Sequence, residues 1–159
     1  MKMKIKVLFV CHGNICRSPM AEFVFKDMVK NIGLGDLFYI ASAATSTEEI
    51  GCGVHQGTRR ILSGLGISTE GKRAVQMTKG DYKAYDYIIA MDQKNMININ
   101  RIIGKDSENK VQKLLDYTHN PKDVADPWYT GDFEQTYIDI VNGCEALLRT
   151  ICEEHHIHS

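Results

Sequence analysis

The sequence lacks several features that mark whole classes of protein. Its apolar runs are about one strand long, far below the roughly 20 residues that a membrane-spanning helix needs. Its formal net charge is -1, so no excess of positive charge indicates nucleic acid or an anionic membrane surface as a partner. No CxxC pair is present, so we expect no structural zinc site, and we expect no other cofactor.

Cysteine is present in a number that argues against a secreted protein. The chain has five cysteines, an odd count at irregular spacing. Secreted disulfide frameworks use an even and patterned set, so we expect reduced thiols and a cytoplasmic location. The 159 residues suit one domain with its own core, over residues 1–159, because no linker, repeat or low-complexity segment divides them. The sequence does not indicate an oligomeric state.

Strand-like and helix-like stretches alternate along the chain. This alternation predicts a parallel sheet with helices on both faces, in which a ligand binds beyond the carboxyl ends of the strands. Apolar, β-prone stretches predict strands over residues 5–10, 38–43, 85–91 and 111–115. Helical spacing of apolar residues predicts helices over residues 19–32, 54–65, 93–103 and 132–154, and residues 71–81 and 116–130 are predicted as loops.

The strongest functional pattern begins at Cys11, where the first strand ends. Five residues separate Cys11 from Arg17, which is enough to turn successive backbone N–H groups toward a bound anion. Gly13 can adopt the positive φ that such a turn needs. Ser18 suits a helix N-cap and Pro19 the first helical position, so the positive end of a helix dipole also faces this turn.

These features predict a phosphate trap with a cysteine beneath it. The planar fork of Arg17 fits two phosphate oxygens at once. The positive field favours the thiolate of Cys11, which can attack the bound phosphorus as a nucleophile. We expect Ser18 to donate a hydrogen bond to the thiolate and the Asn14 amide to brace the loop. The alternative is a strand that ends at a small buried cysteine, followed by an ordinary helix cap.

The stretch resembles the phosphate-binding loop of the low-molecular-weight protein tyrosine phosphatases. Further segments match in the family's order and extend the resemblance over essentially the whole chain. It implies an α/β three-layer sandwich with a four-stranded parallel sheet in the order 2-1-3-4. The matching segments are Cys11-His12-Gly13-Asn14-Ile15-Cys16-Arg17-Ser18-Pro19-Met20-Ala21-Glu22, Ser42-Ala43-Ala44-Thr45-Ser46, Asp86-Tyr87-Ile88-Ile89-Ala90-Met91-Asp92, Asp126-Pro127-Trp128-Tyr129 and Asp132-Phe133.

The resemblance implies an enzyme that hydrolyses phosphotyrosine through a cysteinyl-phosphate intermediate. Cys11 is then the nucleophile, Arg17 a catalytic phosphate ligand, and Asp126 the acid that protonates the phenolate and later the base toward water. By itself the Asp-Pro pair at 126–127 would be read as a turn. Its rivals Asp123 and Asp132 lack that pair. The expected phosphate-binding residues are His12, Gly13, Asn14, Ile15, Cys16, Arg17 and Ser18.

Two segments are expected to wall the substrate cleft. Trp128 and Tyr129 would make it deep enough to favour phosphotyrosine over the shorter phosphoserine, unless they are core aromatics. Glu48 and Glu49 fall in the segment that resembles the family's other wall, which is associated with substrate preference. Two carboxylates there indicate weak tolerance for acidic substrates, unless this loop is merely solvated.

Two further positions bear on how the phosphate loop works. The family implies that Cys16 forms a reversible disulfide with Cys11 and so protects the nucleophile from over-oxidation. The alternative is that Cys16 is a small packed residue. Lys72 stands where many family members have a histidine that braces the phosphate loop. The bracing of this loop is therefore left open.

Three other functions fit parts of the pattern. Protein-arginine phosphatases share the fold, but that branch has a threonine where Ile15 stands. Thioredoxin-coupled arsenate reductases need a close relay of cysteines, which the cysteines beyond the loop do not supply. A non-enzymatic phosphate- or phosphopeptide-binding module would not need Cys11, Arg17 and Asp126 together. We therefore predict a metal-independent phosphatase whose partners are phosphotyrosine proteins and phosphate or other oxyanions.

Overall fold

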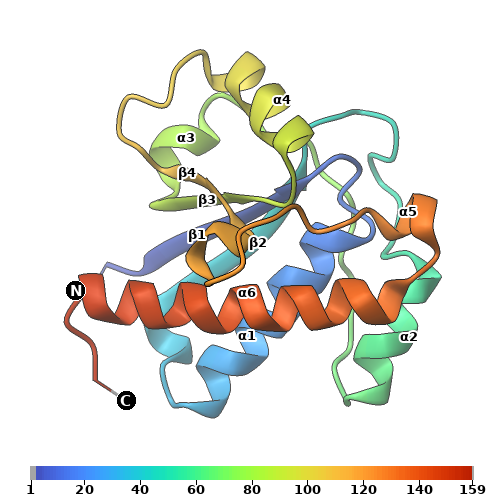
Figure 1. The fold of residues 1–159 in the computed structure, drawn as a ribbon, viewed down its shortest axis with the longest axis horizontal. Helices are drawn as coiled ribbons and strands as arrows, with labels where there is room; N and C mark the ends of the chain where they lie inside the picture. Colours follow the sequence, from blue (N-terminus) through green and yellow to red (C-terminus); the bar gives the residue numbers. More distant parts are fainter. Residues whose placement is uncertain (1–2, 159) are drawn as a thin grey trace.

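A computed structural model describes residues 3–158, which form a parallel sheet between two layers of helices (Figure 1). Residues 1, 2 and 159, at the ends of the domain predicted over 1–159, lie outside the described part. The strand order is β2-β1-β3-β4, and every strand pair is parallel, so the predicted order is confirmed. The strands are β1 (Ile5–Cys11), β2 (Phe38–Ala44), β3 (Tyr87–Ala90) and β4 (Val111–Lys113).

The helices cover both faces of the sheet, as predicted. In Figure 1, α1 and α6 lie against one face with α2 beside them, and α3 and α4 lie against the other. No helix within residues 3–158 is both long enough and apolar enough to span a membrane. The helices are α1 (Arg17–Asn31), α2 (Gln56–Gly64), α3 (Asp81–Ala84), α4 (Gln93–Ile103), α5 (Pro127–Thr130) and α6 (Phe133–Glu154), with 3₁₀ turns at Gly35–Leu37 and Leu114–Tyr117.

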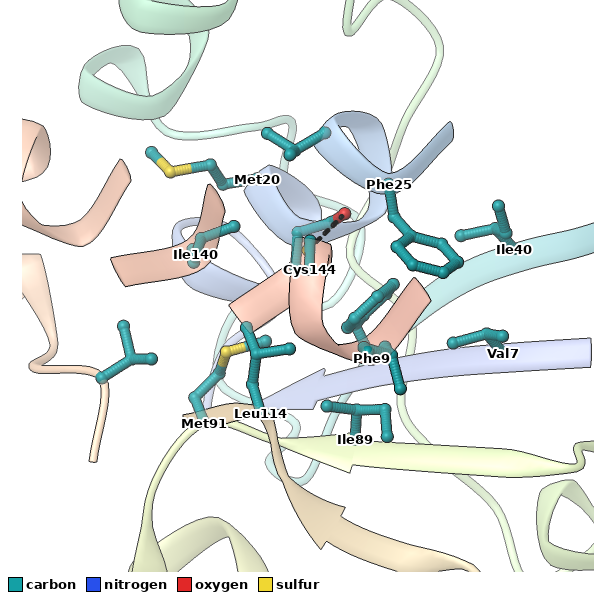
Figure 2. Close-up of a cluster of buried hydrophobic side chains, with 14 of the residues drawn as sticks. Val7, Phe9, Met20, Phe25, Ile40, Ile89, Met91, Leu114, Ile140 and Cys144 are labelled. Atoms are coloured by element: carbon teal, nitrogen blue, oxygen red, sulfur yellow. Dashed lines mark hydrogen bonds between the residues drawn. The ribbon is translucent and has the colours of Figure 1, made fainter. Parts of the chain in front are cut away.

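Strand β1 is central to the core because both of its edges are paired and both of its faces are covered. Its side chains alternate between the faces, as strand geometry requires. Phe9 joins the cluster beneath α1 and α6, whereas Val10 joins the cluster beneath α4. The ring of Phe9 meets Phe25 of α1 edge-on, with centroids 5.6 Å apart (Figure 2). This packing fixes the carboxyl end of β1, where Cys11 lies.

Several local predictions were wrong at element ends. Helix α1 begins at Arg17 with Cys16 at its N-cap, so Ser18 is not the cap. The Ser18 hydroxyl instead contacts Cys11 and Asn14. Helix α2 begins at Gln56 rather than at 54. His55 has a non-helical ψ of 143°, and its side chain accepts from the Gly57 N–H as the N-cap. The predicted loops at 71–81 and 116–130 run into α3, a 3₁₀ turn and α5, which are too short to show a helical period.

Candidate active site

The phosphate loop (residues 11–18) connects β1 to α1 at the carboxyl edge of the sheet. Asn14 has a φ of 58°, in the left-handed region, which asparagine tolerates better than most residues. Its buried amide is fully used. Nδ2 donates to Ser18 Oγ at 2.7 Å and to Ser42 Oγ at 2.9 Å, and Oδ1 accepts from the Val75 N–H at 3.2 Å. The amide therefore braces the loop, as the sequence predicted.

Cys11 meets Ser18 directly. The two side chains are 3.0 Å apart, Sγ to Oγ, and the Ser18 backbone N–H lies 3.4 Å from the same sulfur. Both residues are buried. The sulfur therefore accepts from one backbone N–H and contacts a hydroxyl that can donate to it once it is a thiolate.

A buried charged group ends the hydrogen-bond chain on the far side of Asn14. The Ser42 hydroxyl donates to Glu22 Oε1 at 2.6 Å. Lys72 Nζ lies 3.6 Å from the same oxygen and donates to the Ser42 carbonyl at 2.9 Å, while Lys26 Nζ lies 2.6 Å from Glu22 Oε2. Burial lowers the pKa of Lys72, although Glu22 opposes this effect. Lys72 thus lies inside the network that leads to the phosphate loop.

The Val75 N–H fixes the orientation of the Asn14 amide, because only Oδ1 can accept from it. Nδ2 therefore donates to both hydroxyls, and the Ser42 hydroxyl donates its own proton to Glu22. The Ser18 proton faces two acceptors, the Cys11 sulfur at 3.0 Å and the Ala43 carbonyl at 3.4 Å. Toward a thiolate at Cys11, which can only accept, the Ser18 hydroxyl is the donor.

Arg17 is held in place before any ligand arrives. Its side chain is 2% exposed, and Nη1 donates to Asp92 Oδ2 at 2.7 Å and to the Val124 carbonyl at 2.9 Å. Nη2 lies 3.4 Å from Asp126 Oδ2. Burial alone would lower the pKa of Arg17, but the negative charges of Cys11, Asp92 and Asp126 outweigh burial and raise it. The guanidinium is thus a fixed positive charge beside the sulfur.

Asp126 lies at the start of α5, at the end of a segment that we call the acid loop (residues 124–130). Its Oδ1 accepts from the Trp128 N–H at 3.0 Å, and its Oδ2 faces Arg17. The rival carboxylates lie elsewhere. Asp123 pairs with Lys113 at 3.0 Å, and Asp132 accepts from the Gln135 N–H at the start of α6. Of the three, only Asp126 lines the pocket over the phosphate loop.

That pocket, of about 110 Å³, brings together residues that the sequence placed in separate segments. Asn14 and Ser18 are absent from its lining because they lie beneath the loop. Trp128 and Tyr129 are 58% and 84% exposed, so they are not core aromatics. Within residues 3–158 no three His, Cys, Asp or Glu side chains are grouped to hold a metal ion. The lining is Cys11, His12, Gly13, Ile15, Cys16, Arg17, Glu48, Glu49, Asp126, Trp128 and Tyr129.

The acidic wall is tied to the phosphate loop. Glu48 Oε2 lies 3.0 Å from His12 Nε2, and the Glu49 side chain packs over Gly13. Glu49 also accepts from the Cys52 thiol at 3.4 Å. Both carboxylates therefore lie at the mouth of the pocket rather than in a detached loop.

Cys16 is the second cysteine of the pocket and differs from Cys11 in its surroundings. Burial, followed by the negative charges of Cys11 and Asp126, raises the pKa of Cys16 to about 12. It is therefore a neutral thiol near pH 7. All five cysteines are free thiols in this structure.

Four polar residues of the site were not assigned a role from the sequence. Asp92 follows β3 at the same sheet edge as Cys11, and that placement was a usable signal. Glu22 and Ser42 were quoted within matching segments, but nothing local showed that they meet. His55 carried no signal, although its backbone N–H donates to the Ile15 carbonyl of the phosphate loop at 2.8 Å.

The comparisons with known proteins agree with this geometry. Residues 6–157 match the model of the family described as low molecular weight phosphotyrosine protein phosphatase. The low molecular weight protein-tyrosine-phosphatase YfkJ of Bacillus subtilis is 43% identical over 155 residues, which cover 96% of this chain and 99% of that protein. The low molecular weight protein-tyrosine-phosphatase PtpA of Staphylococcus aureus is 34% identical, over 96% of this chain and 97% of its own length.

Solved structures give the same result. The crystal structure of YfkJ from Bacillus subtilis superposes with a TM-score of 0.92 and covers 96% of this chain and 97% of its own. A Drosophila arginine phosphatase, DARP, superposes with a TM-score of 0.84 at 30% identity and covers 92% of this chain and 98% of its own.

Proposed function

The chain belongs to the low molecular weight phosphotyrosine protein phosphatase family, and from that premise we propose that it hydrolyses phosphotyrosine in proteins with Cys11 as the nucleophile. The observation that carries the proposal is the convergence of three groups. The Cys11 sulfur lies 3.0 Å from Ser18 Oγ, and Arg17 and Asp126 line the same pocket as Cys11. A phosphate bound in this small cleft would have a nucleophile, an anion-binding side chain and a proton donor around it.

The first step transfers the phosphoryl group to sulfur. The loop backbone N–H groups of residues 12–17 and the Arg17 fork hold the phosphate oxygens and the charge that develops on them. The Cys11 thiolate attacks phosphorus, an S–P bond forms, and the P–O bond to the tyrosine ring breaks. Asp126 gives its proton to the departing phenolate.

The second step hydrolyses the cysteinyl-phosphate. Asp126, now ionised, takes a proton from a water molecule whose oxygen attacks phosphorus. The S–P bond breaks, inorganic phosphate leaves and the thiolate is restored. Ser18 supports both steps because its hydroxyl stabilises the thiolate as attacker and as leaving group. No step uses a metal ion.

The walls account for the preference for an aryl phosphate. Trp128 and Tyr129 on one side, and Glu48 and Glu49 on the other, leave Cys11 at the bottom of the pocket. A tyrosyl phosphate is long enough to reach the sulfur, whereas a seryl phosphate is shorter. The exposed aromatic rings of Trp128 and Tyr129 offer a surface against which a phenyl ring can pack.

Further parts of the proposal concern context. We infer that one domain over residues 1–159 carries the whole activity and that it works in the cytoplasm, since a nucleophilic thiol persists in a reducing compartment. We also infer that Cys16 forms a reversible disulfide with Cys11 after oxidation. Both line one pocket, and Cys16 is a thiol that does not compete as nucleophile.

The proposal is tested with p-nitrophenyl phosphate in the presence of EDTA. Turnover should persist with EDTA and be lost in Cys11→Ser, and it should fall in Asp126→Asn because hydrolysis of the cysteinyl-phosphate still needs Asp126 as the base toward water. Normal turnover by Cys11→Ser would sink the mechanism.

Phosphoarginine is the second candidate substrate, because a relative named as an arginine phosphatase has the same fold at 30% identity. Ile15 lines the pocket where that branch has threonine, so we favour phosphotyrosine. Matched phosphotyrosine and phosphoarginine peptides decide between them. Higher kcat/KM on the phosphotyrosine peptide is expected, and the reverse order would replace the substrate assignment.

A further inference from the structure

We propose that the imidazole ring of His55 positions Asp126 for proton transfer by holding Trp128 of the acid loop. The inference rests on the proposed phosphatase function and adds a positioning residue to it. His55 lies outside the pocket lining, between the phosphate loop and α2. Three segments that are distant in sequence meet at this residue.

His55 is itself firmly held. Its backbone N–H donates to the Ile15 carbonyl of the phosphate loop at 2.8 Å. Its ring Nδ1 accepts from the Gly57 N–H at 3.0 Å and so caps α2. The backbone and one ring nitrogen are thus fixed to the part of the site that holds the nucleophile. Any group that packs on this ring is placed relative to the phosphate loop.

Two aromatic rings pack on the imidazole. Phe133, the first residue of α6, stacks on it with centroids 5.0 Å apart and planes inclined by 19°. Trp128 meets it edge-on at 5.7 Å and 80°. A Cβ on Gly57 would lie 2.5 Å from the Phe133 ring, so only glycine allows α2 to approach this closely. The three rings form one contact between α2, α5 and α6.

Trp128 depends on this contact because its side chain is 58% exposed. In the part of the chain that the structure describes, the His55 ring is the only ring paired with the indole. Removing the imidazole would therefore free the indole and the four-residue helix that bears it. Stacking of aromatic edges on faces is directional, so an aliphatic or amide replacement would not hold the indole at the same angle.

Trp128 in turn orients the carboxylate of the acid. Asp126 Oδ1 accepts from the Trp128 N–H at 3.0 Å, and Oδ2 lies 3.4 Å from Arg17 Nη2. A shift of the Trp128 backbone would move the N–H that Oδ1 accepts from but would leave Arg17, which faces Oδ2, in place. The carboxyl group would then rotate away from the leaving oxygen. Displacements of about 1 Å at a reacting group can cost on the order of 10²-fold in rate.

The ring and the cap can be separated by substitution. His55→Asn keeps an acceptor that caps α2 well but removes the ring. His55→Phe keeps a ring and removes the acceptor. His156→Asn is the matched control, because His156 is exposed beyond the far end of α6 and has a φ of 54° that asparagine tolerates.

The readout is the dependence on the leaving group. Phenyl phosphate expels a basic phenolate that needs protonation, whereas p-nitrophenyl phosphate expels a weakly basic one that does not. In His55→Asn, kcat/KM should fall about tenfold for phenyl phosphate and by less than about twofold for p-nitrophenyl phosphate. His55→Phe should keep the wild-type ratio of the two values, and His156→Asn should change neither.

An equal loss on both substrates, no loss, or a ratio disturbed by His55→Phe but not by His55→Asn would overturn the proposal. Should His55→Asn fail to fold, Trp128→Leu removes the other half of the contact and must change the same ratio. If Trp128→Leu kept the wild-type ratio of the two kcat/KM values, the proposal would also be overturned. Wild-type protein without turnover of either phosphate, or an active Cys11→Ser variant, would instead sink the proposed function itself.

Discussion

Lys72 Nζ lies 3.6 Å from Oε1 of the buried Glu22, at the far end of the hydrogen-bond chain that leads to Cys11. Glu22 Oε1 also accepts from the Ser42 hydroxyl at 2.6 Å, so the lysine ammonium and the serine hydroxyl meet at one carboxylate oxygen. From Ser42 the contacts continue through the Asn14 amide to Ser18 and Cys11. Lysine thus braces the loop electrostatically, through Glu22.

Removal of the lysine charge should slow the enzyme. In Lys72→Met, Glu22 loses a counter-charge and the Ser42 carbonyl loses a donor, so we expect kcat/KM for p-nitrophenyl phosphate to fall about tenfold. Lys110→Met is a matched control. Lys110 is 14% exposed against 13% for Lys72, and it too donates to a main-chain carbonyl. Equal effects of the two substitutions would contradict a role in bracing.

The same lysine should leave a signature in the stability of the fold at alkaline pH. Burial lowers the pKa of Lys72 in the folded state. As pH rises through this lowered value toward the ordinary one, the unfolded chain keeps the proton that the folded chain has lost. The free energy of unfolding of the wild type should therefore rise relative to that of Lys72→Met.

Urea titrations of both proteins at about pH 7 and about pH 10 measure this difference. Burial raises the pKa values of some tyrosines and cysteines, and this lowers the free energy of unfolding over the same pH range. That contribution is the same in both proteins, so it cancels in the difference between their free energies of unfolding. If the free energy of unfolding of the wild type fell relative to that of Lys72→Met as pH rose, the lowered pKa of Lys72 would be contradicted.

Cys16 should decide whether oxidation is reversible. Brief peroxide treatment converts the Cys11 thiolate to a sulfenic acid, and the Cys16 thiol can then displace water to form a disulfide. Wild-type activity should return with dithiothreitol, whereas Cys16→Ser should stay inactive after the same exposure. Cys52→Ser is the control, because Cys52 is exposed and lies outside the pocket lining. If Cys52→Ser failed to recover activity and Cys16→Ser recovered it, Cys52 rather than Cys16 would be the thiol that forms the disulfide with Cys11.

The acidic wall should bias the choice of peptide. With Glu48 and Glu49 at the pocket mouth, a phosphotyrosine peptide with flanking lysines should have a several-fold higher kcat/KM than one with flanking glutamates. The preference should shrink in Glu48→Gln/Glu49→Gln and at high salt, because exposed charges are screened. Glu153→Gln, on an exposed turn of α6, should keep it. A preference that survives the double substitution would place its origin elsewhere.

Local patterns were enough to predict the phosphate loop, because the apolar strand, Cys11 and Arg17 are each recognisable within a few residues. The Asp126-Pro127 pair alone reads as a turn, and its assignment as the acid came from the family resemblance. The parallel order of strands then brings their carboxyl ends together, which is why the segments were expected to meet. The structure confirms this topology.

Contacts between distant segments were not predictable in the same way. Arg17 meets Asp92, 75 positions away, and Ser18 is diverted from capping by Cys11 and Asn14. The propensity of serine for N-caps is weaker than the need of a buried hydroxyl for partners. The His55 contact with Trp128 depends on the approach of α2 to α6, which no local pattern encodes.

The central claim is that phosphate passes through Cys11, and a rapid acid quench during turnover of p-nitrophenyl phosphate tests it most directly. Mass spectrometry of the quenched protein should find one added phosphoryl group on the peptide that carries Cys11, and none in Cys11→Ser. A quenched enzyme that turns over yet carries no phosphoryl group, or carries it on another residue, would contradict the account.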